Sequence, residues 1–130
     1  MNTQYLHGLP TEWEATAQVF AALGDGTRQT ILLLFEPGEA IELKTLVDSL
    51  PLSRSATVHH LKALEQAGLL VPLRHGRSLS YTLNAARLVE ALDRVRDYAE
   101  AYFTAADAEA KAARQDGKPA YVPPAGDAEG

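Results

Sequence analysis

Polar side chains that can contact DNA recur at helical spacing within residues 53–66, SRSATVHHLKALEQ. At about 100° per residue, Ser55, His59 and Lys62 fall on one side of the expected helix, and Gln66 continues that side. This side is short, polar and partly cationic, and it offers hydrogen-bond donors at successive turns. A helix with such a face has the size and the chemistry needed to enter the DNA major groove.

Individual residues on this helix have different expected roles. Arg54 could make a bidentate contact to guanine, and a plain phosphate contact is the alternative. The hydroxyls of Ser53 and Ser55, with the amides at the start of the helix, suit phosphate oxygens. His59 points outward and can donate a hydrogen bond to DNA. His60 lies nearer the apolar side, so we expect it to pack against the core.

The chain after this helix predicts a β-hairpin with a basic tip. Two short extended runs, Leu69–Leu73 and Ser78–Leu83, flank a turn expected at residues 74–77, RHGR. Arg74 and Arg77 could enter the minor groove or hold the DNA backbone, whereas solvated turn residues are the alternative. A helix for the major groove followed by such a hairpin is the layout of a winged helix-turn-helix.

The distribution of charge favours the same surface. The net charge is −5, yet residues 51–82 carry four basic residues against one acidic residue, giving +3. A basic patch on an acidic protein suits a directed DNA footprint, although an ordinary solvated face is the alternative. The candidate DNA-binding residues are Ser53, Arg54, Ser55, Val58, His59, Lys62, Arg74, His75 and Arg77.

The segment before residue 53 completes a helix-turn-helix unit. Leu43–Leu50 has apolar residues at i, i+3, i+4 and i+7, which predicts a short amphipathic helix. Pro51 and Leu52 form the turn, and Ser53 is the expected N-cap of the next helix. Gly68 is expected to end that helix.

Two further helices precede this unit. The first should start at Thr11, with Glu14 completing a capping box. The second should begin at Asp25 or Thr27 and end at Phe35. Its C-terminal half is apolar on nearly every side, so we expect it to be the most buried helix.

A long final helix should run from Asn84 to about Ala108 and form a dimer seam. Its apolar stripe spans four turns, which is more than one small domain can bury. Packing back on its own domain is the alternative. The candidate dimer-interface residues, shared with the first helix, are Trp13, Ala17, Phe20, Leu88, Leu92, Val95, Ala99 and Tyr102.

The length of 130 residues indicates one domain of mainly α class with a small β-hairpin. We expect a flexible arm at 1–10, the winged-helix domain at 11–108 and a disordered Pro/Gly-rich tail at 109–130. The absence of cysteine excludes disulfides and thiolate metal sites. We see no signal peptide and no membrane span, so we expect a soluble cytoplasmic protein.

Two other classes of function fit the sequence less well. His59 and His60 near Ser55 could suggest acid–base or nucleophilic chemistry. Adjacent helical residues point about 100° apart, however, and no acid is placed to orient either histidine, so no catalytic residue is predicted. A module that binds another protein is the second alternative, but such faces favour exposed apolar anchors over a basic Ser/His surface.

Four motifs between residues 19 and 83 resemble the ArsR family of small dimeric winged-helix repressors. They are VFAALGDGTRQTILLLF, LVDSLPLSRS, HHLKALEQAGLL and RHGRSLSYTL. The resemblance implies four helices, a β-hairpin and a fifth helix, with dimerisation through the first and last helices. It also implies binding to an imperfect palindrome in promoter double-stranded DNA. Val58 stands where many relatives carry serine, which affects the expected operator.

The inducer does not follow from this resemblance. Relatives that sense arsenic, cadmium or lead carry cysteines near the start of the third helix, where this chain has residues 41–44, IELK. Relatives that sense zinc or nickel use histidines and carboxylates on the last helix, which here has no histidine. We therefore predict no cofactor and none of the usual metal sites. A non-standard site of His7 with carboxylates across the dimer remains an alternative.

Two other possibilities are that the effector is an organic molecule bound near the dimer seam and that there is no effector. Trp13, Tyr98, Tyr102 and Phe103 would line a cleft for such an effector, although aromatic residues at a seam are more often packing.

Overall fold

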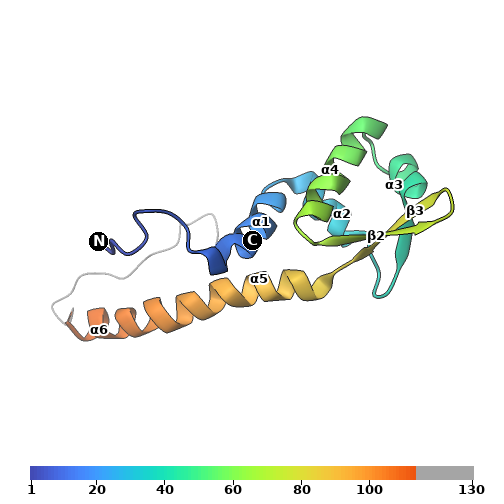
Figure 1. The fold of residues 1–130 in the computed structure, drawn as a ribbon. Helices are drawn as coiled ribbons and strands as arrows, with labels where there is room; N and C mark the ends of the chain where they lie inside the picture. Colours follow the sequence, from blue (N-terminus) through green and yellow to red (C-terminus); the bar gives the residue numbers. More distant parts are fainter. Residues whose placement is uncertain (114–130) are drawn as a thin grey trace. The chain divides into compact units, whose positions relative to one another are not determined.

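The computed structural model describes residues 1–113 as helices joined by a small antiparallel sheet (Figure 1). In chain order the elements are η1 (Thr11–Trp13), α1 (Glu14–Ala22), α2 (Gly26–Leu33), β1 (Ala40–Glu42), α3 (Leu43–Ser49), α4 (Arg54–Gln66), β2 (Leu70–His75), β3 (Ser78–Leu83), α5 (Ala85–Tyr98), η2 (Ala99–Thr104) and α6 (Ala105–Ala113). One compact unit extends to Arg94, and a second begins at Val95. None of the helices within residues 1–113 combines the length and the apolar character that a membrane span requires.

The capping box predicted at the start of the first helix, formed by Thr11 and Glu14, is wrong. Thr11 begins the 3₁₀ turn η1, and Trp13, the N-cap of α1, makes no side-chain capping bond. The N–H of Trp13 donates to the carbonyl of Pro10 at 2.9 Å. Because Trp13 already has helical backbone angles, the chain enters α1 through the 3₁₀ turn rather than from an extended, side-chain-capped residue.

Helix α2 begins at Gly26, between the two predicted starts Asp25 and Thr27, and is less buried than expected. The Asp25 carboxylate accepts from the backbone N–H of Thr27 at 2.8 Å and of Arg28 at 3.2 Å. Ile31 is buried, but Leu33 is 84% exposed. The helix also ends at Leu33 instead of Phe35. Neighbouring helical residues point about 100° apart, so a helix packed on one side leaves part of an all-round apolar run in solvent.

The sheet has the strand order β1-β3-β2, with all pairs antiparallel. Strand β1, which the sequence did not predict, pairs Ile41 with Tyr81. The hairpin turn is tighter than predicted, because His75 pairs with Ser78 and only Gly76 and Arg77 lie between the strands. Gly76 has φ of +59°, which allows this two-residue turn, and Arg74 therefore belongs to β2 rather than to the turn.

The core of the first unit gathers apolar side chains from the elements α1 to α5. Its buried members include Val19, Ala22, Ile31, Leu46, Leu61, Leu64, Leu69, Leu70, Tyr81 and Ala91. The predicted apolar side of the helix at 53–66 is confirmed, because Thr57, Leu61 and Leu64 are fully buried. The helix-turn-helix of α3 and α4 therefore rests on a continuous core that also supports the sheet.

The final helical stretch is longer and less regular than predicted. A π-helical segment, η2, interrupts it between α5 and α6, and α6 continues past the expected end at Ala108 to Ala113. The residues at 109–113 are thus helical rather than part of a disordered tail. The remainder of the predicted tail, 114–130, lies outside the described residues.

Candidate nucleic-acid interface

The N-terminus of α4 is fixed by Ser53, as the sequence predicted. The Ser53 hydroxyl oxygen accepts from the backbone N–H of Ala56 at 3.1 Å. The Thr57 hydroxyl donates to the Ser53 carbonyl at 3.0 Å. The hydroxyls of Ser53 and Ser55 lie 3.3 Å apart and are both exposed. The first turn of α4 thus presents two hydroxyls beside amide groups that carry the positive end of the helix dipole.

Removing the Ser53 hydroxyl should destabilise the fold. We expect Ser53→Ala to lower the free energy of unfolding by about 1 kcal/mol, a typical effect for loss of an N-cap. Ser53→Asp should keep the cap and the stability, because an aspartate carboxylate also accepts hydrogen bonds at an N-cap. Urea denaturation at fixed protein concentration measures the first effect, with the exposed Ser78→Ala as control. Equal stability of Ser53→Ala and wild type would contradict the capping role.

The C-terminus of α4 ends in a Schellman motif. The N–H of Leu69 donates to the carbonyl of Leu64, and the N–H of Gly68 donates to that of Glu65, both at 2.9 Å. Gly68 has φ of +78°, as this motif requires. From α5, the Arg87 Nε donates to the carbonyl of Ala67 at 3.2 Å. Helix α4 is therefore held at both ends.

A contact that sequence reasoning missed joins α2 to the middle of α4. The Arg28 Nε donates to the Nδ1 of His60 at 3.2 Å, and the Arg28 Nη1 donates to the carbonyl of Ala22 at 3.4 Å. His60 is half-buried, in agreement with its predicted place near the core. Its ring meets the ring of exposed His59 edge-on, with centroids 5.8 Å apart. Arg28 thus links α1, α2 and α4.

The hydrogen bonds at the start of α2 also affect Asp25. The backbone N–H of Arg28 is the main cause that holds the pKa of the Asp25 carboxyl below its ordinary value. Burial opposes this shift, while the N–H of Thr27 and the nearby charges of His60 and Arg28 lower the pKa further. A lowered pKa means that the folded state favours the ionised carboxylate.

We expect this carboxylate to make stability depend on pH. Asp25→Asn retains a capping oxygen but lacks the charge. Because the folded-state pKa is depressed, the contribution of the charge is present above the unfolded value of 3.8 and is lost as pH falls through the folded value. Urea midpoints of wild type and variant should therefore differ at neutral pH and converge in acid. A difference independent of pH would contradict this assignment.

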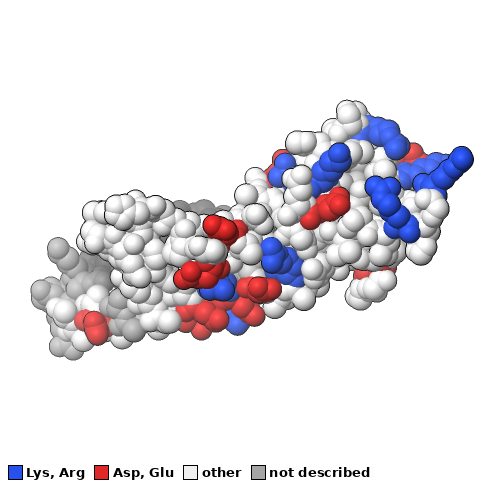
Figure 2. Space-filling view, viewed as in Figure 1, with Lys and Arg blue, Asp and Glu red and all other residues white. Residues whose placement is uncertain are grey.

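The predicted DNA-binding residues lie together on the α4 and hairpin part of the first unit. Ser53, Arg54, Ser55, His59, Lys62, Arg74, His75 and Arg77 are all exposed, and Val58 is half-buried. Figure 2 shows Lys and Arg side chains gathered over this part of the chain. Exposure of cationic and hydroxyl groups around a capped helix and a hairpin is the arrangement that phosphate and base contacts need.

The predicted dimer residues divide between exposed and packed positions. Leu88 packs against the core of the first unit, and half-buried Trp13 lies under Arg94, whose Cζ is 5.8 Å from the indole centroid. The others are exposed: Ala17, Phe20, Leu92, Val95, Ala99 and Tyr102. The helix α5 thus has one side on its own core, as the alternative reading allowed, and an apolar side that faces solvent.

The second unit holds three of the four aromatic residues predicted to line an effector cleft, whereas Trp13 belongs to the first unit. Tyr98 stacks on Tyr102 at 5.6 Å and meets Phe103 edge-on at 5.7 Å. The π-helical segment explains this grouping, because it brings residues i and i+5 to the same side. Across residues 1–113, no three His, Asp or Glu side chains gather as a metal site would require.

The helix-turn-helix of α3 and α4, followed by the β2–β3 wing, defines the winged helix-turn-helix class of DNA-binding proteins. Residues 25–70 match the family model described as bacterial regulatory protein, arsR family. A solved ArsR-like transcriptional regulator from Rhodococcus sp. RHA1 is 29% identical, with a TM-score of 0.66 over 85% of this chain and 100% of that chain. The chain belongs to the ArsR family and is a transcriptional regulator.

Two other comparisons bear on the role and on the fold. An uncharacterised HTH-type transcriptional regulator of Methanocaldococcus jannaschii is 31% identical over 65 residues, which cover 50% of this chain and 73% of that protein. HlyU from Vibrio cholerae is 23% identical with a TM-score of 0.54, covers 67% of this chain and 97% of that one, and has the same fold. Members of this family are regulators rather than enzymes, and none of these similarities names an inducer for this chain.

Proposed function

We propose that this regulator is a homodimeric repressor that binds an imperfect palindrome in promoter DNA. The observation that carries the proposal is the exposed basic and hydroxyl-rich face of α4, joined by the hairpin arginines on a chain that is otherwise acidic. Helix α4 enters the major groove and the hairpin lies beside it over the backbone or the minor groove.

The first turn of α4 combines base reading with phosphate binding. Arg54 directs its guanidinium to the O6 and N7 of guanine, and the hydroxyls of Ser53 and Ser55 bind phosphate oxygens. His59 and Lys62 continue the same exposed face along the groove. Arg74 and Arg77 of the wing add sequence-independent attraction to the backbone.

A dimer joins two such surfaces through the exposed apolar side of α5. Leu92 is 50% exposed and Val95 is 37% exposed on the same side of this helix. Phe20 on α1, at 41% exposed, adds a large apolar side chain to the surface of the first unit. Burying these groups against a second copy removes apolar area from water, which favours association. Two copies also double the basic patch and match the two-fold symmetry of a palindrome.

Selection from random DNA tests this proposal. The purified full chain is used to enrich duplexes from a randomised pool at low salt, and the enriched duplexes are sequenced. We expect an inverted repeat with half-site centres about one helical turn, roughly 10 bp, apart. Enrichment of no motif, or of a single half-site without symmetry, would overturn the dimeric palindrome model. Blocking of a promoter that carries the selected site, in an in vitro transcription assay, tests repression.

A further inference from the structure

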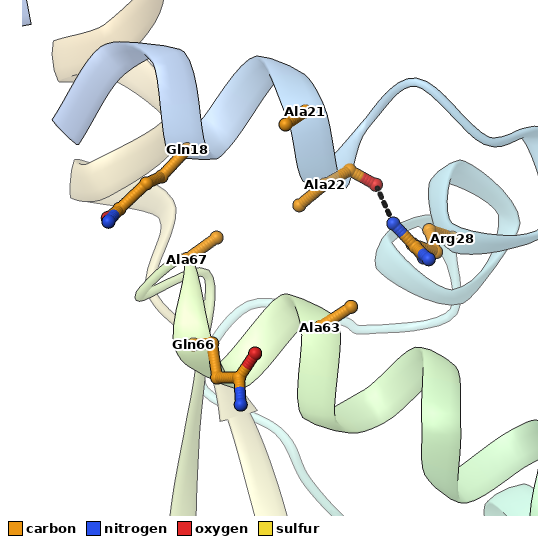
Figure 3. A pocket seen from close by; sticks show the side chains of 7 residues that line it. All are labelled: Gln18, Ala21, Ala22, Arg28, Ala63, Gln66 and Ala67. Carbon is orange, nitrogen blue, oxygen red and sulfur yellow. Dashed lines mark hydrogen bonds between the residues drawn. The ribbon is translucent and has the colours of Figure 1, made fainter. Parts of the chain in front are cut away.

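A cavity of about 290 Å³ lies between α1 and α4 within the first unit (Figure 3). It exists because both helices present alanines at this point, and small side chains leave space that larger ones would fill. The volume is near the lower end of the range for small-molecule sites. The alanines that form its floor are Ala21, Ala22, Ala63 and Ala67.

Three of the residues that line this cavity carry polar side chains. Figure 3 shows Arg28 at one end of the lining residues and Gln18 at the other, with Gln66 between Ala67 and Ala63. Glutamine amides can both donate and accept hydrogen bonds. A molecule that spans the floor would thus meet a cation at one end and amides along the rest of its length.

Arg28 is the chemically distinctive member of this group. It is half-buried and donates to two acceptors that are not carboxylates, the Nδ1 of His60 and the carbonyl of Ala22. Within residues 1–113 it forms no ion pair with a carboxylate. The nearby Asp25 carboxylate instead accepts backbone N–H groups. A guanidinium has five N–H donors in a planar fork that matches a carboxylate, so this cation retains capacity for an anion.

We propose that the cavity binds a small organic carboxylate as an effector. Its carboxylate pairs with the Arg28 guanidinium, its short carbon skeleton lies on the alanine floor, and a hydrogen-bonding group on that skeleton meets the amide of Gln66 or of Gln18. The charged end supplies a strong, charge-assisted hydrogen bond. The small volume limits the skeleton to a few carbon atoms.

The position of this site gives it a regulatory consequence, which rests on the proposed function. The cavity lies between α1 and the DNA-contacting helix α4, and Arg28 is also the residue that holds His60 of α4. A carboxylate that draws the guanidinium toward itself competes with that hydrogen bond. An effector can change the affinity for DNA only if it binds more tightly when α4 is in one position than when α4 is in another.

Binding is tested first without DNA. N-acetylglycine, which carries a carboxylate and an amide, is titrated into ¹⁵N-labelled full chain, with uncharged N-acetylglycinamide as the matched probe. We expect saturable shifts of backbone amide signals at residues 18–22 and 63–67 for the acid and none for the amide. No shifts in these segments, or equal shifts with both probes, would overturn the proposal.

Two variants locate the site. Ala21 lines the cavity but is exposed, so Ala21→Leu should fill the cavity and weaken binding by about tenfold or more while the fold persists. Ala86→Leu, at an exposed position of α5 outside the cavity, should bind as wild type does. Unchanged binding in Ala21→Leu would place the ligand elsewhere and refute the site.

The effect on DNA is measured separately. Fluorescence anisotropy with a selected duplex should show weaker binding when N-acetylglycine saturates wild type, and no change for Ala21→Leu. Amide shifts without any change in DNA affinity would refute the coupling to α4 but leave the cavity as a ligand site. DNA binding without amide shifts would refute the cavity site while leaving the DNA-binding proposal intact.

Discussion

Replacing Leu92 by Glu is expected to separate the proposed dimer and to weaken operator binding by about 100-fold or more, because simultaneous binding to two half-sites is lost. Leu92 is half exposed in the chain itself, so the change should leave the fold of each copy intact. In a dimer seam the same change places a charge where apolar groups pack, at a large desolvation cost. Light scattering should give twice the chain mass for wild type and the chain mass for Leu92→Glu.

A second substitution on α5 provides the control for this experiment. Ala86→Glu adds the same charge to an exposed position on a different side of the helix. It should remain dimeric and bind the selected palindrome as wild type does. If Leu92→Glu kept the wild-type mass and the wild-type affinity, the apolar side of α5 would not be the dimer seam.

Removing Arg54 and His59 together should abolish most of the preference for the operator. One bidentate contact from arginine to guanine is worth about 1–3 kcal/mol of discrimination, and it occurs in each half-site. Over two half-sites this amounts to about 2–6 kcal/mol, so we expect Arg54→Ala/His59→Ala to bind the selected palindrome at least tens of times more weakly. Binding to a scrambled duplex, which relies on phosphate contacts, should change much less. Anisotropy titrations with both duplexes measure the two quantities.

Removing the wing arginines should instead lower the affinity for DNA without changing the preference for the operator. Arg74→Ala/Arg77→Ala is expected to weaken both duplexes alike and to reduce the dependence of affinity on salt, because each lost phosphate contact lowers the salt slope by about one. Lys111→Ala, an exposed cation on α6, should change neither quantity.

Wild-type discrimination in the Arg54/His59 variant would show that α4 does not read the bases.

Helix α4 could be predicted in detail because its signals are local. Its cap Ser53, its buried side with Leu61 and Leu64, and its end at Gly68 are each encoded within a few residues of their effect. The tertiary contacts around the same helix could not be predicted in this way. The hydrogen bond between Arg28 and His60 depends on how α2 packs against α4, which no local spacing specifies.

The contrast between local signals and tertiary contacts also explains why the structure differs from the predictions elsewhere in the fold. Strand β1 has only three residues, too few to show a period of two, and it exists because Tyr81 of β3 pairs with Ile41. Leu33 is apolar, so its residue type predicts burial. It is exposed because it lies on the side of α2 that does not face the core. The π-helical segment at Ala99–Thr104 was not predicted from the sequence, and it places Phe103 beside Tyr98.

Chemical protection of lysine in the wild-type protein tests the central claim most directly. Lys62 on α4 and Lys111 on α6 are both exposed, so an acetylating reagent should modify both in the free protein. Addition of the selected palindrome should protect Lys62 and leave Lys111 reactive, as measured by mass spectrometry of peptides. Protection of Lys111 with undiminished reactivity of Lys62 would contradict the placement of DNA on α4.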